Sequence, residues 1–350
     1  MLISRRIASS LIVLMLASVF VMIDGTRRDA LAQQSSPIES AERERGKQLY
    51  ERGDTDGAIS ALRTAVKKHE TDADAWHYLG LALSRDGKSQ EARKAFEEAV
   101  RLRPGFALAH SNLAYMLLEL NRLAEAKGAA QRALATDSGN ALAHYVIGAA
   151  LLREGDPQNA LKEAEAALKT RADFPAALLL KTQALISLYA SGMVAGGSLP
   201  GEDSRAARAL MLKEAAGSLD MYLKLSPNIA EAGIWREQLE ALRFYAGLGN
   251  KSGGKSDVVQ SKEVTTKVHI TYKPEPPFTD AARAARISGR VVLQAVFSSD
   301  GSVKHILVLR ALPLGLTEKA VEAARKLKFT PATKDGRPVS MFYRIEYNFN

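Results

Sequence analysis

Hydrophobic and polar residues follow three different patterns along the chain, and each pattern predicts a different structure. Residues 7–23 carry no charge and are strongly apolar over 11–16. Between about residues 39 and 246, small and apolar residues recur at fixed intervals, as expected for packed helices. From 291 onwards, apolar and polar residues alternate as in strands. The sequence therefore predicts an N-terminal export segment, a long helical region and a small mixed domain.

The uncharged N-terminal stretch follows Arg5 and Arg6, which is the arrangement of an export signal. Ala30-Leu31-Ala32 has the small-x-small pattern of a signal-peptidase site, so we expect residues 1–32 to be a signal peptide cleaved after Ala32. The alternative is an uncleaved anchor, because about 17 residues at 1.5 Å per residue only just cross a bilayer core. In both cases the rest of the chain is exported to the periplasm.

Alanines mark a repeat of 34 residues in the helical region. Ala58, Ala92, Ala126 and Ala160 are spaced by this interval, and Ala65, Ala99, Ala133 and Ala167 repeat it in a second register. Such a period predicts a solenoid of stacked helix pairs, in which each repeat buries its apolar face against the next.

The second repeat resembles the tetratricopeptide repeat (TPR) through Trp76, Leu79, Gly80, Ala92, Phe96, Ala99 and Pro104. Small residues at Gly80 and Ala92 let paired helices approach closely, and we expect Trp76 and Phe96 to fill the space between neighbouring hairpins. We assign a TPR solenoid to residues 39–246, with four clear repeats at 39–72, 73–106, 107–140 and 141–174. A degenerate fifth repeat follows, with helices at 175–189 and 204–225 around a Gly-rich insertion, 191–201, and a capping helix at 229–246.

The resemblance implies a concave groove that takes up segments of partner proteins. Side chains on the first helix of each repeat should line this groove: His77, Leu81, Ser84, Ser111, Tyr115, Leu118, Tyr145 and Leu152. This set is mainly apolar, so it would suit an apolar ligand segment. The alternative for each residue is packing against an adjoining helix.

Glycines and small polar residues over 247–265 predict a flexible linker. The domain that follows, residues 266–350, is expected to fold as a small α+β sandwich with the order helix, strand, strand, helix, strand. Its second helix begins near Leu316, where Thr317 can cap free backbone amides.

This C-terminal region resembles the TonB C-terminal domain. The matching segments occur in the family's order: Pro277 to Arg283, Ile287 to Val292, Asp300-Gly301, Phe329 to Ala332 and Asp335 to Val339. The family resemblance implies a periplasmic domain that grips an extended peptide from an outer-membrane transporter. Such docking needs an exposed strand edge, and we expect it on the last strand, at Tyr343, Arg344, Ile345, Glu346 and Tyr347. The alternative is that this strand is paired or buried in a dimer.

Two features of TonB energy transducers are missing. No histidine precedes His69 to contact an inner-membrane motor, and the predicted linker contains no proline to form a rigid spacer. The resemblance therefore supports docking more strongly than force transduction.

Composition excludes several classes of site. The chain has no cysteine, which rules out disulfides, thiolate metal sites and cysteine nucleophiles. Its net charge of +9 is concentrated in the last 85 residues, but these charges are scattered and predict no nucleic-acid binding. None of the six histidines forms a metal-binding motif, and His110 and His144 occupy the repeat position of Trp76, so we interpret them as packing residues. No nucleotide or nucleophile motif is present.

We therefore predict an α-helical TPR solenoid followed by a small α+β TonB C-terminal-like domain, with no enzymatic activity, catalytic residues, metal or cofactor. The expected partners are proteins of the cell envelope. One hypothesis is a component of TonB-type outer-membrane transport, which meets inner-membrane motor proteins if residues 7–23 remain as an anchor. The other is a periplasmic scaffold or adaptor that transmits no force.

Overall fold

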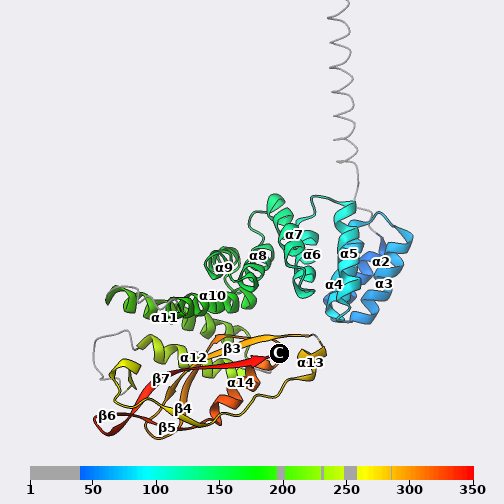
Figure 1. Cartoon of the computed structure of the whole chain (residues 1–350). Helices are drawn as coiled ribbons and strands as arrows, with labels where there is room; N and C mark the ends of the chain where they lie inside the picture. Colours follow the sequence, from blue (N-terminus) through cyan, green and yellow to red (C-terminus); the bar gives the residue numbers. More distant parts are fainter. Residues whose placement is uncertain (1–39, 195–201, 230–231, 248–257, 285) are drawn as a thin grey trace, which may run out of the picture. The chain divides into compact units, whose positions relative to one another are not determined.

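A computed structural model describes residues 40–194, 202–229, 232–247, 258–284 and 286–350 (Figure 1). The predicted signal or anchor segment, 1–32, lies outside these ranges, as do 195–201 of the insertion and 248–257 of the linker. The chain divides into two compact units, Met1–Leu120 and Asn121–Asn350. Within the described residues no helix is long and apolar enough to cross a membrane.

Consecutive helices build the described part of the first unit. They are α2 (Ala41–Glu51), α3 (Thr55–Lys68), α4 (Ala73–Arg85), α5 (Ser89–Leu102) and α6 (Ala107–Glu119). Asp72 caps α4 by accepting hydrogen bonds from the backbone amides of Asp74 and Ala75. Its carboxylate also pairs with Arg43 of α2 at 3.1 Å, and both side chains are largely buried. This pair links α2 to the start of α4. Losing either partner would leave the other as a buried, uncompensated charge.

Close packing of α4 against α5 depends on a glycine. A Cβ atom placed on Gly80 would lie 2.6 Å from the ring of Phe96, which is 1% exposed. Ala92 and Ala99 of α5 are fully buried. Phe96 therefore fills the space within its own hairpin. The prediction had placed it between neighbouring hairpins. The small-residue pattern behind the predicted repeat is confirmed.

The second unit continues with further helices, of which α10, α11 and α12 are longer than those of the first unit. They are α7 (Leu123–Thr136), α8 (Ala141–Glu154), α9 (Pro157–Thr170), α10 (Pro175–Val194), α11 (Glu202–Leu225) and α12 (Ala232–Gly247). Helix α10 extends five residues past the predicted end, so the first four residues of the predicted insertion are helical. The extended part contacts α11, since Arg208 donates a hydrogen bond to the Gly192 carbonyl at 3.1 Å.

The C-terminal domain is a small α+β fold, as predicted (Figure 1). Its elements are β1 (Val258–Val259), a 3-10 turn η1 (Ser261–Glu263), β2 (His269–Tyr272), α13 (Asp280–Ala284), β3 (Gly289–Phe297), β4 (Val303–Arg310), α14 (Leu316–Arg325), β5 (Lys328–Thr330), β6 (Ala332–Lys334) and β7 (Arg337–Phe349). The main sheet has the order β1-β7-β3-β4, and β6 also pairs with β7. Strands β2 and β5 form a separate pair. The expected order of helices and long strands is present, with four short strands added.

Helix α14 covers one face of this sheet. Leu293 and Phe297 of β3 are fully buried in a core that includes Leu316 and Val321 of α14. Thr317 was expected to cap free amides of this helix, but the N-cap is Gly315, whose φ of 81° suits a residue without a Cβ. The Thr317 hydroxyl instead donates to the Leu312 carbonyl and accepts from its amide. That prediction was wrong, because the chain reaches α14 through a left-handed turn.

The last solenoid helices cover the opposite face. Val292, Leu307 and Leu309 of the sheet share a buried cluster with side chains of α10, α11 and α12. This explains why β3 is buried almost continuously from Val291 to Phe297 rather than at alternate residues only. The sheet is therefore packed between α14 and the end of the solenoid.

The predicted linker differs from the structure over its described residues. Val258 and Val259 pair in parallel with Ser340 and Met341 of β7 instead of forming flexible chain. The partners lie about eighty residues further along the sequence, so no local pattern could have indicated this pairing.

Candidate protein-docking surfaces

The eight side chains predicted to line the solenoid groove fall into two groups. His77, Ser111 and Leu118 are buried at 6%, 1% and 0% exposure, so they pack inside the protein and offer no surface to a partner. The predicted orientation of these three side chains was wrong. The repeat spacing is the same for the helix face that lines the groove and for the face that packs against neighbouring helices, so it does not distinguish them. The others are partly exposed: Leu81, Ser84, Tyr115, Tyr145 and Leu152.

Tyr145 and Leu152 line a hollow of about 390 Å³ in the second unit. Its other walls come from α10 and α11 and include Leu179 and Tyr222. The hollow is mainly aliphatic and aromatic, with Arg153, Gln183 and Ser226 as polar residues. This composition agrees with the expectation of an apolar ligand segment, and the binding role of these residues stays a prediction.

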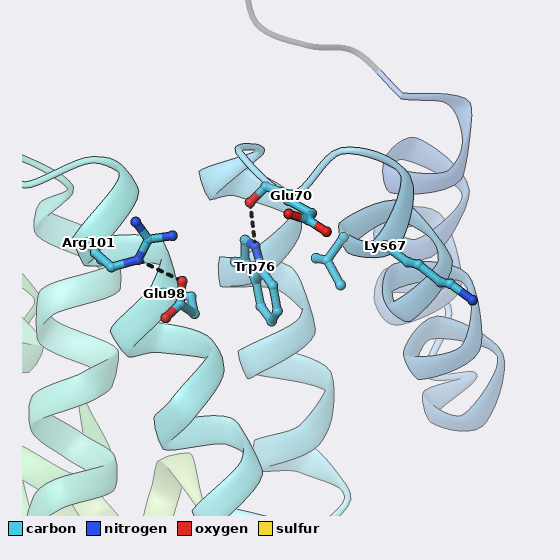
Figure 2. Close-up of a pocket in the computed structure, with 6 residues that line it drawn as sticks. Lys67, Glu70, Trp76, Glu98 and Arg101 are labelled. Atoms are coloured by element: carbon cyan, nitrogen blue, oxygen red, sulfur yellow. Dashed lines mark hydrogen bonds and ion pairs between the residues drawn. The ribbon is translucent and has the colours of Figure 1, made fainter.

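A second hollow, of about 330 Å³, lies beside Trp76 in the first unit (Figure 2). The indole N–H of Trp76 donates to the Glu70 carbonyl at 3.0 Å. Arg101 donates to Glu98 at 2.8 Å on the opposite side. Trp76 thus lies at a partly exposed position, among residues of α3 in the first repeat and of α5 in the second.

His77 is buried as a neutral side chain beside aromatic rings. Its ring lies 4.9 Å from Phe106 and 5.8 Å from Phe96, and its Nε2 is 3.0 Å from the amide nitrogen of Asn112. Burial lowers the pKa of His77 to about 4; the positive charge of Arg103 adds to this shift, and Asp74 opposes it. An acidified protein must therefore either protonate His77 in an apolar site or unfold.

This burial predicts a pH dependence of stability. The unfolded chain has a histidine pKa near 6.5, so it binds a proton more readily than the folded chain below that pH. Stability should be retained above pH 6.5 and lost as the pH falls toward 4. Between pH 7 and pH 5 we expect the first unit to lose about 2 kcal/mol through His77. Urea unfolding at both pH values should show this loss, and His77→Leu should remove it; an equal loss in the variant would assign it to other groups.

The two histidines at the repeat position of Trp76 also have structural partners. His110 is 4% exposed, and its Nε2 is 2.8 Å from the Pro104 carbonyl. The Nδ1 of His144 is 2.7 Å from Glu163. Within the described ranges no group of three or more His, Asp or Glu side chains could hold a metal ion.

Strand β7 contains all five residues predicted to dock a peptide. One side of it pairs with β3 in continuous antiparallel register, from Met341 opposite Phe297 to Phe349 opposite Gly289. The side chains of Tyr343, Ile345 and Tyr347 pack with the α14 core. Arg344 and Glu346 alternate with them and are partly exposed.

The other side of β7 is only partly occupied. Strand β1 pairs with residues 340–341 on this side. Beyond Met341, no strand among the described residues pairs with this side. The Lys273 ammonium donates to the Glu346 carbonyl at 2.8 Å, so this carbonyl points away from β3. Because main-chain groups alternate along a strand, those of Phe342 and Arg344 point the same way. We call the outward side of Phe342 to Asn348 the β7 edge.

Charged and aromatic groups surround the β7 edge. Glu346 pairs with Arg290 at 3.2 Å and with Arg344 at 3.5 Å. The Lys273 ammonium lies 4.9 Å from the centre of the Tyr347 ring. Burial raises the pKa of Tyr347 to about 12, and the charge of Glu275 adds to this shift. These side-chain contacts surround the strand whose outward side forms the β7 edge.

The opposite edge of the sheet, on β4, is closed by the solenoid. The Gln238 side chain of α12 donates to the Ile306 carbonyl at 3.0 Å and accepts from the Val308 amide at 2.8 Å. It therefore imitates the peptide group of a neighbouring strand. The Tyr245 hydroxyl also donates to the His305 carbonyl at 3.1 Å, and the His305 ring stacks on Phe244 at 3.8 Å. This closure could not be predicted, because a glutamine on a helix carries no sign of its distant partner.

Comparison with known families agrees with this architecture. Residues 274–350 match the family described as "Gram-negative bacterial TonB protein C-terminal". Residues 43–105, 79–141 and 111–177 match the tetratricopeptide repeat. The chain thus carries tetratricopeptide repeats followed by a TonB C-terminal domain, and both are interaction modules.

Curated relatives match a short part of the chain. The peroxisomal targeting signal receptor of Saccharomyces cerevisiae is 33% identical over 66 residues, which is 19% of this chain and 11% of that protein. The receptor of Kluyveromyces lactis is 38% identical over 56 residues, 16% of this chain and 10% of that protein. The chain spans about a tenth of the length of these relatives.

Solved structures with similar helices include a thermophilic TPR protein of Thermus thermophilus. It is 18% identical with a TM-score of 0.43, covering 58% of this chain and 100% of that one. The pilF protein of Pseudomonas aeruginosa is 20% identical with a TM-score of 0.40, covering 56% and 95%. Similarities of this size carry no argument about function.

Proposed function

We propose that this protein is a non-enzymatic protein-binding protein of the cell envelope, which docks an extended peptide of a partner beside β7. The single observation that carries this is the contrast between the two sheet edges. Gln238 closes the β4 edge, whereas no strand among the described residues pairs with the main-chain groups of the β7 edge, where the Lys273 side chain holds the Glu346 carbonyl. An added strand would satisfy these groups and extend the sheet. The hollow beside Tyr145 and Leu152 would take an apolar segment of a second protein.

The TonB C-terminal domain supports a role in outer-membrane transport. In this proposal the docked peptide belongs to an outer-membrane transporter, and the protein lies in the periplasm. If residues 7–23 are retained as an anchor, inner-membrane motor proteins become further partners.

One observation favours the second candidate, a periplasmic scaffold or adaptor that transmits no force. The sheet packs directly on α10, α11 and α12, so the solenoid and the docking edge are held together. A domain that pulls on a distant transporter would need a long spacer instead. Retention in the inner membrane would favour transport, and release of the mature protein by osmotic shock would favour the scaffold.

Arg344→Pro is expected to weaken peptide docking at least tenfold. The substitution removes an amide that faces the β7 edge. The ladder to β3 keeps its donors because this amide points away from β3, and proline is tolerated at such an edge position. Losing this hydrogen bond leaves its partner group unpaired and costs about 1.4 kcal/mol of binding free energy, which corresponds to a tenfold weaker affinity. The measurement is titration of the full chain with an eight-residue peptide of alternating valine and threonine, flanked by lysines.

The matched control is Arg344→Ala, which removes the same side chain but keeps the amide. It should bind the peptide within about threefold of the parent chain if main-chain pairing dominates. The parent protein and Arg344→Ala should also retain an outer-membrane transporter from solubilised outer membranes, and Arg344→Pro should not. Equal binding by all three proteins would exclude the β7 edge as the docking site.

A further inference from the structure

The segment that joins the solenoid to the C-terminal domain already contributes a strand to the side of β7 where a peptide would dock. Val258 and Val259 pair in parallel with Ser340 and Met341, immediately before the β7 edge begins. The two valines are partly buried there. An internal strand thus lies in line with the position that a docked peptide would take.

The chain leaves the sheet directly after these two residues. Gln260 ends the strand, and the 3-10 turn η1 at Ser261–Glu263 directs the backbone away. At the far end, Lys273 reaches back to the Glu346 carbonyl. Between these two contacts only four residues remain, Phe342 to Ile345, or about 13 Å of strand. A longer peptide ladder would have to displace β1, Lys273 or both.

Displacement of β1 requires little free energy. The backbone entropy lost on ordering these two residues is of the same size as the free energy that their hydrogen bonds return. A peptide that pairs with six or more residues of β7 would form a longer ladder in exchange for this short one. The local balance therefore permits strand exchange while the rest of the sheet stays folded.

We propose that β1 is an internal strand that occupies the start of the docking site and is exchanged for the partner's extended segment. The inference rests on the proposed docking at β7 and adds a way in which the chain would regulate that docking. Because β1 continues from the segment that follows α12, anything that pulls or binds this segment would alter the length of edge open to a partner. The solenoid and the docking edge are then connected through β1 as well as through Gln238.

The test compares two double variants of the full chain. Val258→Pro with Val259→Pro removes both amides of β1 and prevents pairing. Val258→Thr with Val259→Thr keeps the amides and the preference for strand. Titration with the eight-residue valine-threonine peptide should show about tenfold tighter binding to the proline variant than to the parent or the threonine variant.

Hydrogen exchange provides a second readout on the parent chain. Saturating peptide should remove exchange protection from the amides of the β1 valines while the β3–β7 ladder stays protected. Equal affinity of all three proteins, or continued protection of β1 in the complex, would overturn the exchange while leaving docking at β7 intact. Failure of every protein to bind the peptide would overturn the proposed docking and the exchange together.

Discussion

Leu242→Ala is expected to destabilise the second unit by about 2–5 kcal/mol, the usual range for emptying a fully buried leucine site. Leu242 lies on α12, is completely buried, and belongs to the cluster that joins the solenoid helices to Val292, Leu307 and Leu309 of the sheet. The cavity would therefore weaken the packing of the solenoid helices and of the sheet together. Urea unfolding followed by circular dichroism should show the loss, with the sheet and the last helices unfolding in one transition.

The matched control is Leu210→Ala on α11, where the side chain is 65% exposed. It should change stability by no more than about 0.5 kcal/mol, as is usual for a surface position. If Leu242→Ala had an equally small effect, α12 would not be packed against the sheet. Full chains are needed for this experiment, because removing the solenoid would expose Leu307 and Leu309.

Phe96→Ala is expected to destabilise the first unit by about 3–5 kcal/mol, because it leaves a large cavity between α4 and α5. The ring is 1% exposed and lies against the backbone at Gly80. Thermal or urea unfolding of the full chain should show an early transition in the first unit. Leu108→Ala, at a residue that is 56% exposed, is the control and should have little effect.

Gly80 offers a sharper check of the same contact. Gly80→Ala in the parent chain would place a Cβ atom 2.6 Å from the Phe96 ring, so it should destabilise by about 1–3 kcal/mol. In the Phe96→Ala background the added methyl group meets empty space and should be neutral or stabilising. Additive effects in this double-mutant cycle would contradict direct packing of the two residues.

The two modules are connected differently in the structure from the sequence-based prediction. A linker predicted to be flexible suggested a docking domain that moves freely beside the solenoid. Instead, Gln238 of α12 makes two hydrogen bonds with β4, and the buried cluster around Leu242 joins the same elements. The solenoid closes one sheet edge and leaves the other accessible. In the proposed function, this arrangement directs partners to β7 and prevents pairing at β4.

Much of the fold could be predicted because its signals are local. Ala58, Ala92, Ala126 and Ala160 recur every 34 residues because each helix pair needs a small residue where its backbones approach. The alternation from Tyr343 to Phe349 predicted β7 because side chains of a strand point to opposite faces. In the structure, Arg344 and Glu346 lie outside the core that Tyr343, Ile345 and Tyr347 join.

Features that depend on distant partners could not be predicted in this way. The burial of His77 and Leu118 depends on which face of a helix meets its neighbours, and the spacing of the repeat is identical for both faces. The cap of α14 depends on the left-handed turn at Gly315, not on Thr317 alone.

The sequence by itself determined the repeat, the two modules and the strand that carries the proposed docking site, since these follow from periodicity and short motifs. Only the tertiary structure decided that Gln238 closes β4, that β1 joins β7 and that no described strand pairs with the β7 edge. Backbone hydrogen bonds between segments far apart in the chain use groups that every residue possesses, so side-chain patterns give no indication of which segments pair.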